Sequence, residues 1–254
     1  MHRFFIFEPD KIENNRTIIV SDELLHQFCN VLKFHLGEQV LFLDNTGDEY
    51  LCAIENISKK EIAACVIEKR KNAAEPRVKI CLYQAIPKNQ EKLEMVLQKG
   101  TEVGVSEFVP MITARTEKES LNKIPRLQKI LKESAEQSGR GIIPVLREPV
   151  KFEKILKSVS TAAGRVSQSP NKKIVQLLAH TQAQKSFKDI SGDLRGEGSR
   201  GAEQINIFIG PEGGFTEQEI AAAEQAGAII CNFGPRVLRS ETAGIVIPYL
   251  IQCY

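Results

Sequence analysis

The chain has 254 residues, and its 34 Lys and Arg against 32 Asp and Glu leave a formal net charge of only +2. With 42% hydrophobic and 26% charged residues it has the composition of a globular protein, which excludes wholesale disorder. No apolar run approaches the ~18 residues of a membrane span. A total near neutrality excludes a uniformly basic protein that coats nucleic acid. The length is enough for one or two domains.

The amino-terminal residues and the cysteines indicate a cytoplasmic protein. Pro9 and several charged residues interrupt the first stretch of the chain too early for a secretory signal peptide. The six cysteines lie mostly inside apolar runs, which predicts buried and reduced thiols. Neither they nor the four histidines have the spacing of metal ligands, so we expect no metal site.

Residues 1–72 are predicted to form a compact β-barrel-like module around one helix. Short β-rich runs are separated by turn signals; they are residues 4–7, 16–20, 39–44, 50–58 and 61–70. Apolar residues at helical spacing predict a helix over 22–34, with Ser21 as its N-cap. The polar run 68–77, which contains Pro76, is predicted to link this module to a second domain.

Residues 73–254 are predicted to form an α/β domain. Nearly continuous apolar runs alternate with helical patterns; the runs are 77–86, 108–112, 144–146, 174–180, 205–210 and 228–234, and the clearest helices are 89–104 and 121–138. This alternation predicts a doubly wound parallel sheet that is covered by helices on both faces. The polar, Gly-rich interval 182–204 is expected to be an exposed, mobile loop.

The charge is unevenly distributed along the chain. Residues 1–72 hold 9 Lys or Arg and 12 Asp or Glu, whereas residues 73–254 hold 25 and 20. Within the second part, residues 115–173 hold 14 basic and only 6 acidic residues. A Lys-rich helix can simply be a solvated face, but an excess of this size is what a surface that contacts phosphates requires.

The sequence Gly196-Glu-Gly198-Ser-Arg-Gly201 has the GxGxxG pattern of dinucleotide-binding sites. That pattern must follow a strand and open a helix to bind a pyrophosphate. Here it lies in a polar interval and precedes a strand-like run, so we do not interpret it as a nucleotide site.

The segment INIFIGPEGGFTEQEI predicts a ligand site at the edge of the sheet. A buried strand ends at Gly210, a tight turn covers 211–214, and Thr216 begins a helix with a capping box to Glu219. Adjacent glycines let backbone groups approach a ligand closely, and ligands bind at the carboxyl ends of strands in such sheets. A plain strand-to-helix connection is the alternative.

Three further segments carry polar residues at the ends of predicted elements. In GPRVLRSETA, Arg236 and Arg239 follow a strand, and Ser240 is a candidate cap of the last helix with Glu241 in its first turn. Capping with a surface salt bridge would explain Glu241 alone, but two arginines beside a second glycine turn suggest a site. KGTEVG (99–104) and EQSGR (136–140) end two helices, and each alone is typical of a polar helix end.

Together, KGTEVG, EQSGRGIIP, IGPEGGFTEQE and GPRVLRSETA resemble, in order and spacing, the RsmE-type family. These are the ribosomal small-subunit RNA uridine-N3 methyltransferases of the SPOUT superfamily. The resemblance covers essentially the whole chain, and the leading module is similar to the family's PUA-like RNA-binding domain. Four residues depart from the usual pattern: Gly100 replaces Ala, Val103 and Phe233 replace Leu, and Ser240 replaces Thr.

The resemblance implies an N-terminal PUA-like β-barrel domain over 1–72 and a SPOUT domain with a C-terminal trefoil knot over 73–254. It implies a homodimer that methylates uracil N3 in 16S RNA of the small ribosomal subunit, with S-adenosyl-L-methionine as cofactor. The implied cofactor-binding residues lie at three strand ends: Leu178, His180, Ile209, Gly210, Pro211, Glu212, Gly213, Gly214, Phe233, Gly234, Val237, Leu238 and Thr242.

For catalysis we expect Arg239 to stabilise the anion of uracil, because N3 is a poor nucleophile until it loses its proton. Glu102 and Glu241 are candidate bases, and methyl transfer without a protein base is equally open. Arg140 is expected to bind the base or a phosphate. The expected RNA contacts are Arg3, Arg16, Lys99, Gln137, Arg140 and Arg236, with the run Lys69–Lys71 as a further basic patch.

Two alternatives to this function stay open on the sequence. A related SPOUT enzyme could modify transfer RNA or another position, and a catalytically silent RNA-binding assembly factor could retain the same fold. The intact glycine turns and the two loop arginines favour an enzyme.

Overall fold

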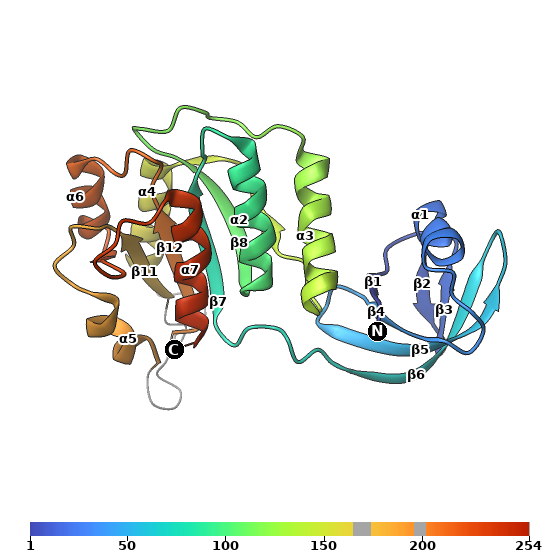
Figure 1. The fold of residues 1–254 in the computed structure, drawn as a ribbon. Helices are drawn as coiled ribbons and strands as arrows, with labels where there is room; N and C mark the ends of the chain where they lie inside the picture. The colour runs from blue at the N-terminus through green and yellow to red at the C-terminus, as the bar shows by residue number, and fades with distance from the viewer. Residues whose placement is uncertain (165–173, 196–201, 254) are drawn as a thin grey trace. The chain divides into compact units, whose positions relative to one another are not determined.

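The computed structural model describes residues 1–164, 174–195 and 202–253, and the chain forms two compact units (Figure 1). The first unit comprises Met1–Glu75 with Lys132–Ile143, and the second comprises Pro76–Leu131 with Pro144–Tyr254. Helix α3 (Ile124–Ser138) therefore contributes its second half to the first unit. A domain boundary between residues 72 and 73 stays a prediction.

The first unit is a curled six-stranded sheet in the order β1-β4-β5-β6-β3-β2. Only β1 and β4 are parallel among these pairs. The strands are β1 (Arg3–Phe5), β2 (Lys11–Glu13), β3 (Arg16–Ile19), β4 (Gln39–Leu43), β5 (Asp48–Ile57) and β6 (Ile62–Lys71). Phe4, Phe28 and Phe42 are buried in its core. Phe4 and Phe42 are cross-strand partners on β1 and β4, so their side chains lie on the same face of the sheet. The five predicted strands of this module are confirmed.

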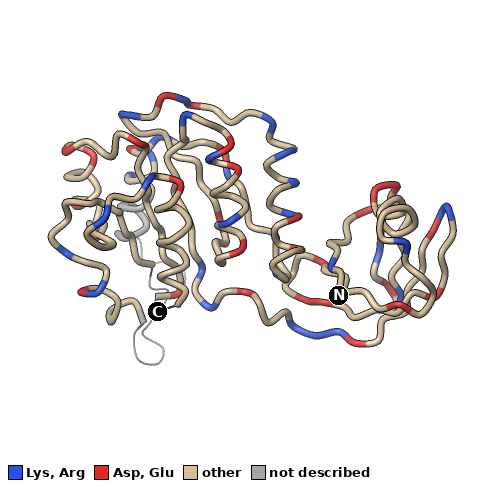
Figure 2. Tube along the Cα trace, viewed as in Figure 1, with Lys and Arg blue, Asp and Glu red and all other residues tan. Residues whose placement is uncertain are grey.

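The predicted linker 68–77 is wrong at its beginning, because residues 68–71 belong to β6. Cross-strand ion pairs hold this basic segment (Figure 2) in the sheet. Lys69 and Lys71 both pair with Asp48, and Arg70 pairs with Glu49. Hydrogen bonds from the two lysines hold the pKa of the Asp48 carboxyl below its usual value. The expected basic patch of Lys69–Lys71 is thus matched by carboxylates.

The predicted helix 22–34 is shorter than expected. It consists of α1 (Asp22–His26) and one π-helical segment, η1 (Gln27–Val31). Ser21 occupies the N-cap position, but its side chain does not cap the helix, which corrects the prediction. Its hydroxyl instead donates to Oδ2 of Asp10 at 2.6 Å, and Oδ1 of Asp10 accepts the backbone N–H of Ser21.

The second unit is a parallel sheet in the order β10-β8-β7-β12-β11-β13, with β9 paired to β8. Its strands are β7 (Lys79–Ala85), β8 (Val105–Ile112), β9 (Val145–Leu146), β10 (Val150–Lys151), β11 (Ile174–Ala179), β12 (Gln204–Ile209) and β13 (Ile229–Cys231). Its further helices are α2 (Gln90–Glu102), α4 (Phe152–Gly164), α5 (Phe187–Arg195), α6 (Glu217–Gln225) and α7 (Ser240–Cys253). The predicted alternation of strands and helices is confirmed.

Helices cover both faces of this parallel sheet, as predicted. On one face α2 and α7 pack side by side (Figure 1). On the other, α4 and α6 share a buried cluster with β12 around Phe208. Successive residues of β7 serve the two faces in turn, since Gln84 contacts α7 and Ala85 joins the cluster around Phe208. Within the described residues no helix is long and apolar enough to cross a membrane.

The interval 182–204 is not entirely a loop, which corrects the prediction. Helix α5 lies within it, and its Phe187, Ile190 and Leu194 are buried. These apolar residues are spaced three and four apart, which is the period of one helix face, but the polar residues between them hid the pattern. The GxGxxG sequence of Gly196–Gly201 lies outside the described residues.

The second half of α3 packs within the first unit through both apolar and polar contacts. Ala135 is buried against Phe5 and Leu43. The carboxylate of Glu136 accepts the backbone N–H of Phe5 at 3.0 Å, and burial raises the pKa of this carboxyl. A segment far along the chain thus completes the core of the amino-terminal module.

Candidate active site

A cavity of about 690 Å³ opens at the carboxyl ends of β11, β12 and β13 in the second unit. These three strands are parallel neighbours, so the loops that follow them meet at one edge of the sheet. Of the residues predicted to bind a cofactor, those that line it are His180, Ile209–Gly214, Phe233, Gly234, Val237 and Leu238. Arg236 and Arg239 line it as well.

Two of the predicted cofactor residues do not line the cavity. Leu178 is fully buried in the core behind it, and Thr242 is half-buried in the first turn of α7. The structure adds Lys92 from α2 and Arg115 from the loop after β8. Neither was predicted, because each lies in an ordinary polar segment and approaches the cavity only through the fold.

The turn 211–214 is held rigidly between β12 and α6. The predicted capping box of Thr216 and Glu219 is confirmed. The N–H of Gly214, which has a positive φ of 69°, donates to the carbonyl of Pro211 at 2.9 Å. Arg115 donates from Nη1 to the carbonyl of Gly213 at 2.5 Å. The turn is therefore stabilised by a hydrogen bond within itself and by one from Arg115, in the loop after β8.

The backbone groups of Gly210 and of the turn that follows it differ in whether they have a hydrogen-bond partner. The carbonyls of Gly210, Pro211 and Gly213 accept hydrogen bonds from protein donors. Pro211 has no N–H. Among the described residues, the N–H groups of Gly210 and Gly213 have no hydrogen-bond partner. Unpaired backbone donors are rare in folded proteins, so these two N–H groups are available to donate to a bound molecule.

The loop after β13 contributes one aromatic ring, that of Phe233, and two arginines to the lining of the cavity. Phe233 stacks on the buried Phe187 of α5, with ring centroids 5.4 Å apart. Arg236 and Arg239 are exposed, and within the described part of the chain neither guanidinium has an ion pair or hydrogen bond. Ser240 is the first residue of α7, and its hydroxyl donates to the carbonyl of Gly210, so the predicted cap is wrong.

Lys92 lies between two glutamates at the cavity. Its Nζ is 3.4 Å from Glu212, which lines the cavity, and 3.5 Å from Oε1 of Glu241. Burial raises the pKa of the Glu212 carboxyl, but hydrogen bonds from its own backbone and from Lys92 outweigh this and the pKa is lowered. Glu241 is only 8% exposed, and its Oε2 has no hydrogen-bond partner in the described residues.

Lys99 and Glu102 lie together at the last turn of α2. Nζ of Lys99 is 2.8 Å from a carboxylate oxygen of Glu102, three residues later on the same helix face. Neither residue lines the cavity. Glu102, a predicted catalytic candidate, therefore lies outside the cavity that Arg239 lines.

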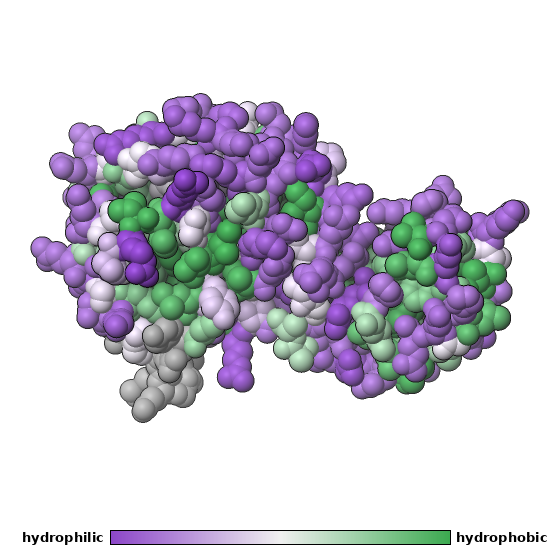
Figure 3. All heavy atoms as spheres, in the orientation of Figure 1, coloured by the Kyte–Doolittle hydropathy of each residue, from purple (hydrophilic) through white to green (hydrophobic). Residues whose placement is uncertain are grey.

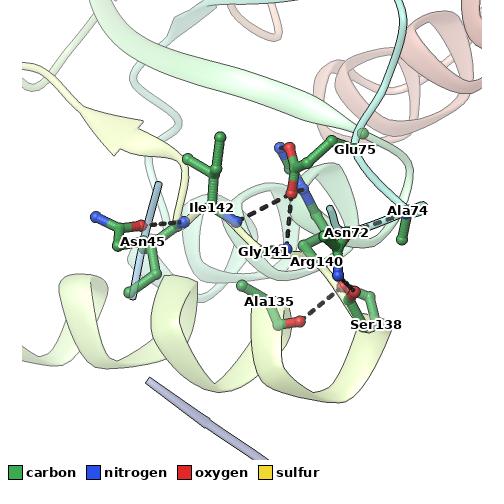
Figure 4. Close-up of polar contacts among 12 residues, drawn as sticks. Asn45, Asn72, Ala74, Glu75, Ala135, Ser138, Arg140, Gly141 and Ile142 are labelled. Carbon is green, nitrogen blue, oxygen red and sulfur yellow. Dashed lines mark hydrogen bonds and ion pairs between the residues drawn. The ribbon is translucent and has the colours of Figure 1, made fainter. Parts of the chain in front are cut away.

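Arg140 belongs to the first unit and is only 2% exposed (Figure 4). Its Nη2 is 3.0 Å from Oε2 of Glu75. The other oxygen of Glu75 accepts the backbone N–H groups of Gly141 at 2.9 Å and Ile142 at 3.0 Å. The arginine of the EQSGR motif is thus part of a buried ion pair that fixes the chain after α3.

The other residues predicted to contact RNA also lie in the first unit, apart from Lys99 and Arg236. Gln137 is exposed on the last turn of α3. Arg3 is half-buried with its guanidinium carbon 3.4 Å from where a Cβ would stand at Gly139, and its buried Nε has no partner in the described residues. Arg16 has a 63% exposed side chain and pairs with Glu55 at 3.3 Å.

Models of known protein families match both parts of the chain. An RNA methyltransferase domain matches residues 74–252, and an RNA methyltransferase PUA domain matches residues 20–67. The chain is 32% identical to the Ribosomal RNA small subunit methyltransferase E of Bacillus subtilis, over 96% of this chain and 93% of that protein. It is 30% identical to the protein of the same name from Mesomycoplasma hyopneumoniae, over 100% and 99%.

Two solved structures have the same fold over nearly their full length. The Ribosomal RNA small subunit methyltransferase E from Neisseria gonorrhoeae, bound to S-adenosyl methionine, matches with a TM-score of 0.80 and 25% identity, covering 100% of this chain and 97% of that one. A putative methyltransferase from Legionella pneumophila in complex with the same cofactor gives 0.75 and 28%, covering 99% and 96%. The chain belongs to the RNA methyltransferase family of these proteins, the RsmE-type family that its motifs resemble.

Proposed function

We propose that this enzyme methylates N3 of a uracil in 16S RNA of the small ribosomal subunit, with S-adenosylmethionine as methyl donor. The observation that carries the proposal is the cavity at three strand ends. It is lined by Arg239, whose guanidinium has no carboxylate partner within the described residues. The names of the relatives and the cofactor bound to two of the similar structures support it.

The residues of the cavity fit this cofactor. A volume of about 690 Å³ is in the range of pockets that bind molecules of its size. The free N–H groups of Gly210 and Gly213 match acceptor atoms, and Glu212 with Lys92 matches a charged amino-acid end. When bound, S-adenosylmethionine supplies an electrophilic methyl group on a positively charged sulfur.

We assign Arg239 to the stabilisation of the uracil anion. The proton on N3 lies between two carbonyl groups, and its loss spreads negative charge onto both oxygens. A fixed guanidinium beside these oxygens lowers the pKa of the base and stabilises the charge in the transition state. Neither Glu102 nor Glu241 lines the cavity, which argues against either of these two residues as the base.

The basic stretch 115–173 supports RNA binding, but fewer of its residues are available for phosphate contacts than their number suggests. Three of its arginines pair with carboxylates from outside the stretch: Arg126 with Glu94, Arg140 with Glu75 and Arg147 with Glu107. Lys118, Lys151 and Lys154 are exposed and, within the described residues, have no ion pair. We assign phosphate contacts to these lysines, together with Arg236, Lys99, Arg3, Arg16 and Gln137.

We further propose that the enzyme acts in the cytoplasm as a homodimer. Figure 3 shows apolar residues gathered on the face that carries α7 and α2. Val246 and Tyr249 of α7 and Met95 of α2 are 45%, 57% and 48% exposed, which is costly unless a partner covers them. Light scattering should give about twice the 28.4 kDa of one chain; a monomer at micromolar concentration would contradict the dimer. The trefoil knot stays a prediction.

The proposed function predicts two results with the purified protein. Calorimetry should detect S-adenosylmethionine binding, and cofactor with a labelled methyl group should label 16S RNA in small subunits from cells that lack the enzyme. Subunits from cells that contain it should take up no label, because their site is already methylated. Absence of cofactor binding would favour a silent RNA-binding factor, and label only in transfer RNA would identify a different substrate.

A further inference from the structure

A single hydroxyl group, that of Ser240, connects three segments around the cavity. Nε2 of Gln84, near the end of β7, donates to Oγ of Ser240 at 2.8 Å. Oγ of Ser240 donates to the carbonyl oxygen of Gly210 at 2.6 Å. A serine hydroxyl has one hydrogen, so donation to Gly210 fixes it as the acceptor from Gln84. The direction of both hydrogen bonds is therefore determined.

This chain of hydrogen bonds is buried and spans long separations in sequence. Gln84 and Ser240 are 2% and 7% exposed, and they lie 156 residues apart in the chain. Buried hydrogen bonds of this kind are costly to break, because a group that loses its partner cannot bind water instead. The start of α7 is thus tied to the ends of two adjacent strands, β7 and β12.

Within the described chain, the side chain of Gln84 leaves one buried polar atom without a hydrogen-bond partner. Its Oε1 is buried with no hydrogen-bond partner among the described residues. A Cβ at Gly244 of α7 would collide with the same oxygen, so a side chain there would displace the Gln84 amide. A leucine or methionine could fill the space without an unsatisfied oxygen. The amide provides two hydrogen bonds that leucine and methionine lack: one at 2.8 Å to Oγ of Ser240 and a longer one at 3.3 Å to the carbonyl of the adjacent Ala85. Only the first reaches α7, and it orients Ser240.

Ser240 lies between the residue assigned to cofactor binding, Gly210, and the residue assigned to catalysis, Arg239. On one side, Ser240 holds the carbonyl of Gly210 and so orients that residue, whose free N–H we assign to the cofactor. On the other, Ser240 directly follows Arg239, whose guanidinium we assign to the uracil anion. Methyl transfer requires the donor and the nucleophile in line, and small displacements reduce the rate steeply.

We propose that Ser240, held by Gln84, is a positioning residue that fixes the cofactor turn relative to Arg239. This inference rests on the proposed function and deepens it, because it names the group that aligns the two halves of the site. Ser240 lines the cavity, but its hydroxyl is bonded to Gln84 and to the carbonyl of Gly210, so it acts through the Gly210 peptide and through the backbone of Arg239.

The test compares Ser240→Ala with Ser240→Thr in the full-length protein. We expect Ser240→Ala to weaken S-adenosylmethionine binding about 10-fold and to lower kcat about 10-fold at saturating cofactor, with KM for the small subunit unchanged. Ser240→Thr keeps the hydroxyl and should restore Kd and kcat to within about 2-fold of the wild type. Gln84→Met keeps the Ser240 hydroxyl but removes the amide that donates to it and, more weakly, to the carbonyl of Ala85. It should give an intermediate loss of about 3-fold and serves if Ser240→Ala does not fold.

The matched control is Asn206→Ala in the middle of β12. Asn206 is 4% exposed and donates to Oε1 of Gln176 at 2.9 Å, so this change also removes a buried hydrogen bond from the same sheet. It should lower Tm by a similar amount and leave Kd and kcat unchanged, because Asn206 does not line the cavity.

The proposal is overturned if Ser240→Ala lowers Tm but keeps the wild-type Kd and kcat, or if Ser240→Thr fails to restore them. It is also overturned if Asn206→Ala loses binding and turnover to the same extent. A wild-type enzyme that methylates a different RNA would overturn the proposed substrate only, since the comparison of cofactor Kd values between variants would still decide the role of Ser240.

Discussion

Replacing Arg239 with alanine is expected to lower kcat for methyl transfer by about 100-fold or more, the usual cost of losing a donor that stabilises an oxyanion. The guanidinium is exposed at the cavity and, in the described chain, has no carboxylate partner, so its loss should affect the reaction more than the fold. Cofactor affinity measured by calorimetry should change little. Arg239→Lys should recover only part of the rate, because an ammonium lacks the planar fork of donors.

Arg236 provides the comparison within the same loop. Arg236→Ala should raise KM for the small subunit about 10-fold and leave kcat nearly unchanged, which is the signature of a lost binding contact. Raising the pH should reduce the defect of Arg239→Ala but not that of Arg236→Ala, because uracil then loses its N3 proton without help. Wild-type turnover by Arg239→Ala, with cofactor binding intact, would contradict the assignment.

Removing Arg140 is expected to destabilise the protein by about 3 kcal/mol, because a buried carboxylate then loses its partner. Arg140 and Glu75 have side chains only 3% and 19% exposed. The unfolding free energy of Arg140→Ala, measured with urea, should fall by this amount, and Tm should drop by several degrees. Because Lys132–Ile143 packs within the first unit, the loss should appear first in signals from the amino-terminal module.

The double variant Glu75→Gln with Arg140→Met separates a structural role from contact with RNA. It removes both charges and should regain much of the lost stability. If Arg140 acts through its ion pair, this variant methylates small subunits at close to the wild-type rate, which is the result we expect from its burial. A stable but inactive double variant would show instead that Arg140 contacts the substrate, as the motif predicts.

Features that depend on residues close together in sequence could be predicted well. Most strands of both units, the turn after Gly210 and the capping box of Thr216 and Glu219 are determined within a few residues, whereas the short strands β2 and β10 were not predicted. The alternation of apolar strands and helices was enough to predict the parallel sheet. Helix α5 was missed because its apolar residues are few and lie in a polar, Gly-rich interval.

Features that depend on distant partners left no local signal. Glu75 neutralises Arg140 across 65 residues, and Lys92 reaches Glu212 across 120. The role of Ser240 was mistaken for a helix cap, because its true partners, Gln84 and Gly210, meet it only through the fold. For the same reason, counting charges overestimated the basic surface, since several arginines pair with distant carboxylates.

The most direct measurement is mass-spectrometric mapping of the methyl group after purified small subunits are incubated with the enzyme and labelled S-adenosylmethionine. The expected result is a single new methyl group on N3 of one uracil in 16S RNA, formed by the wild type and lost with Arg239→Ala. A methyl group on another atom, label in a different RNA, or no transfer despite cofactor binding would contradict the proposed function.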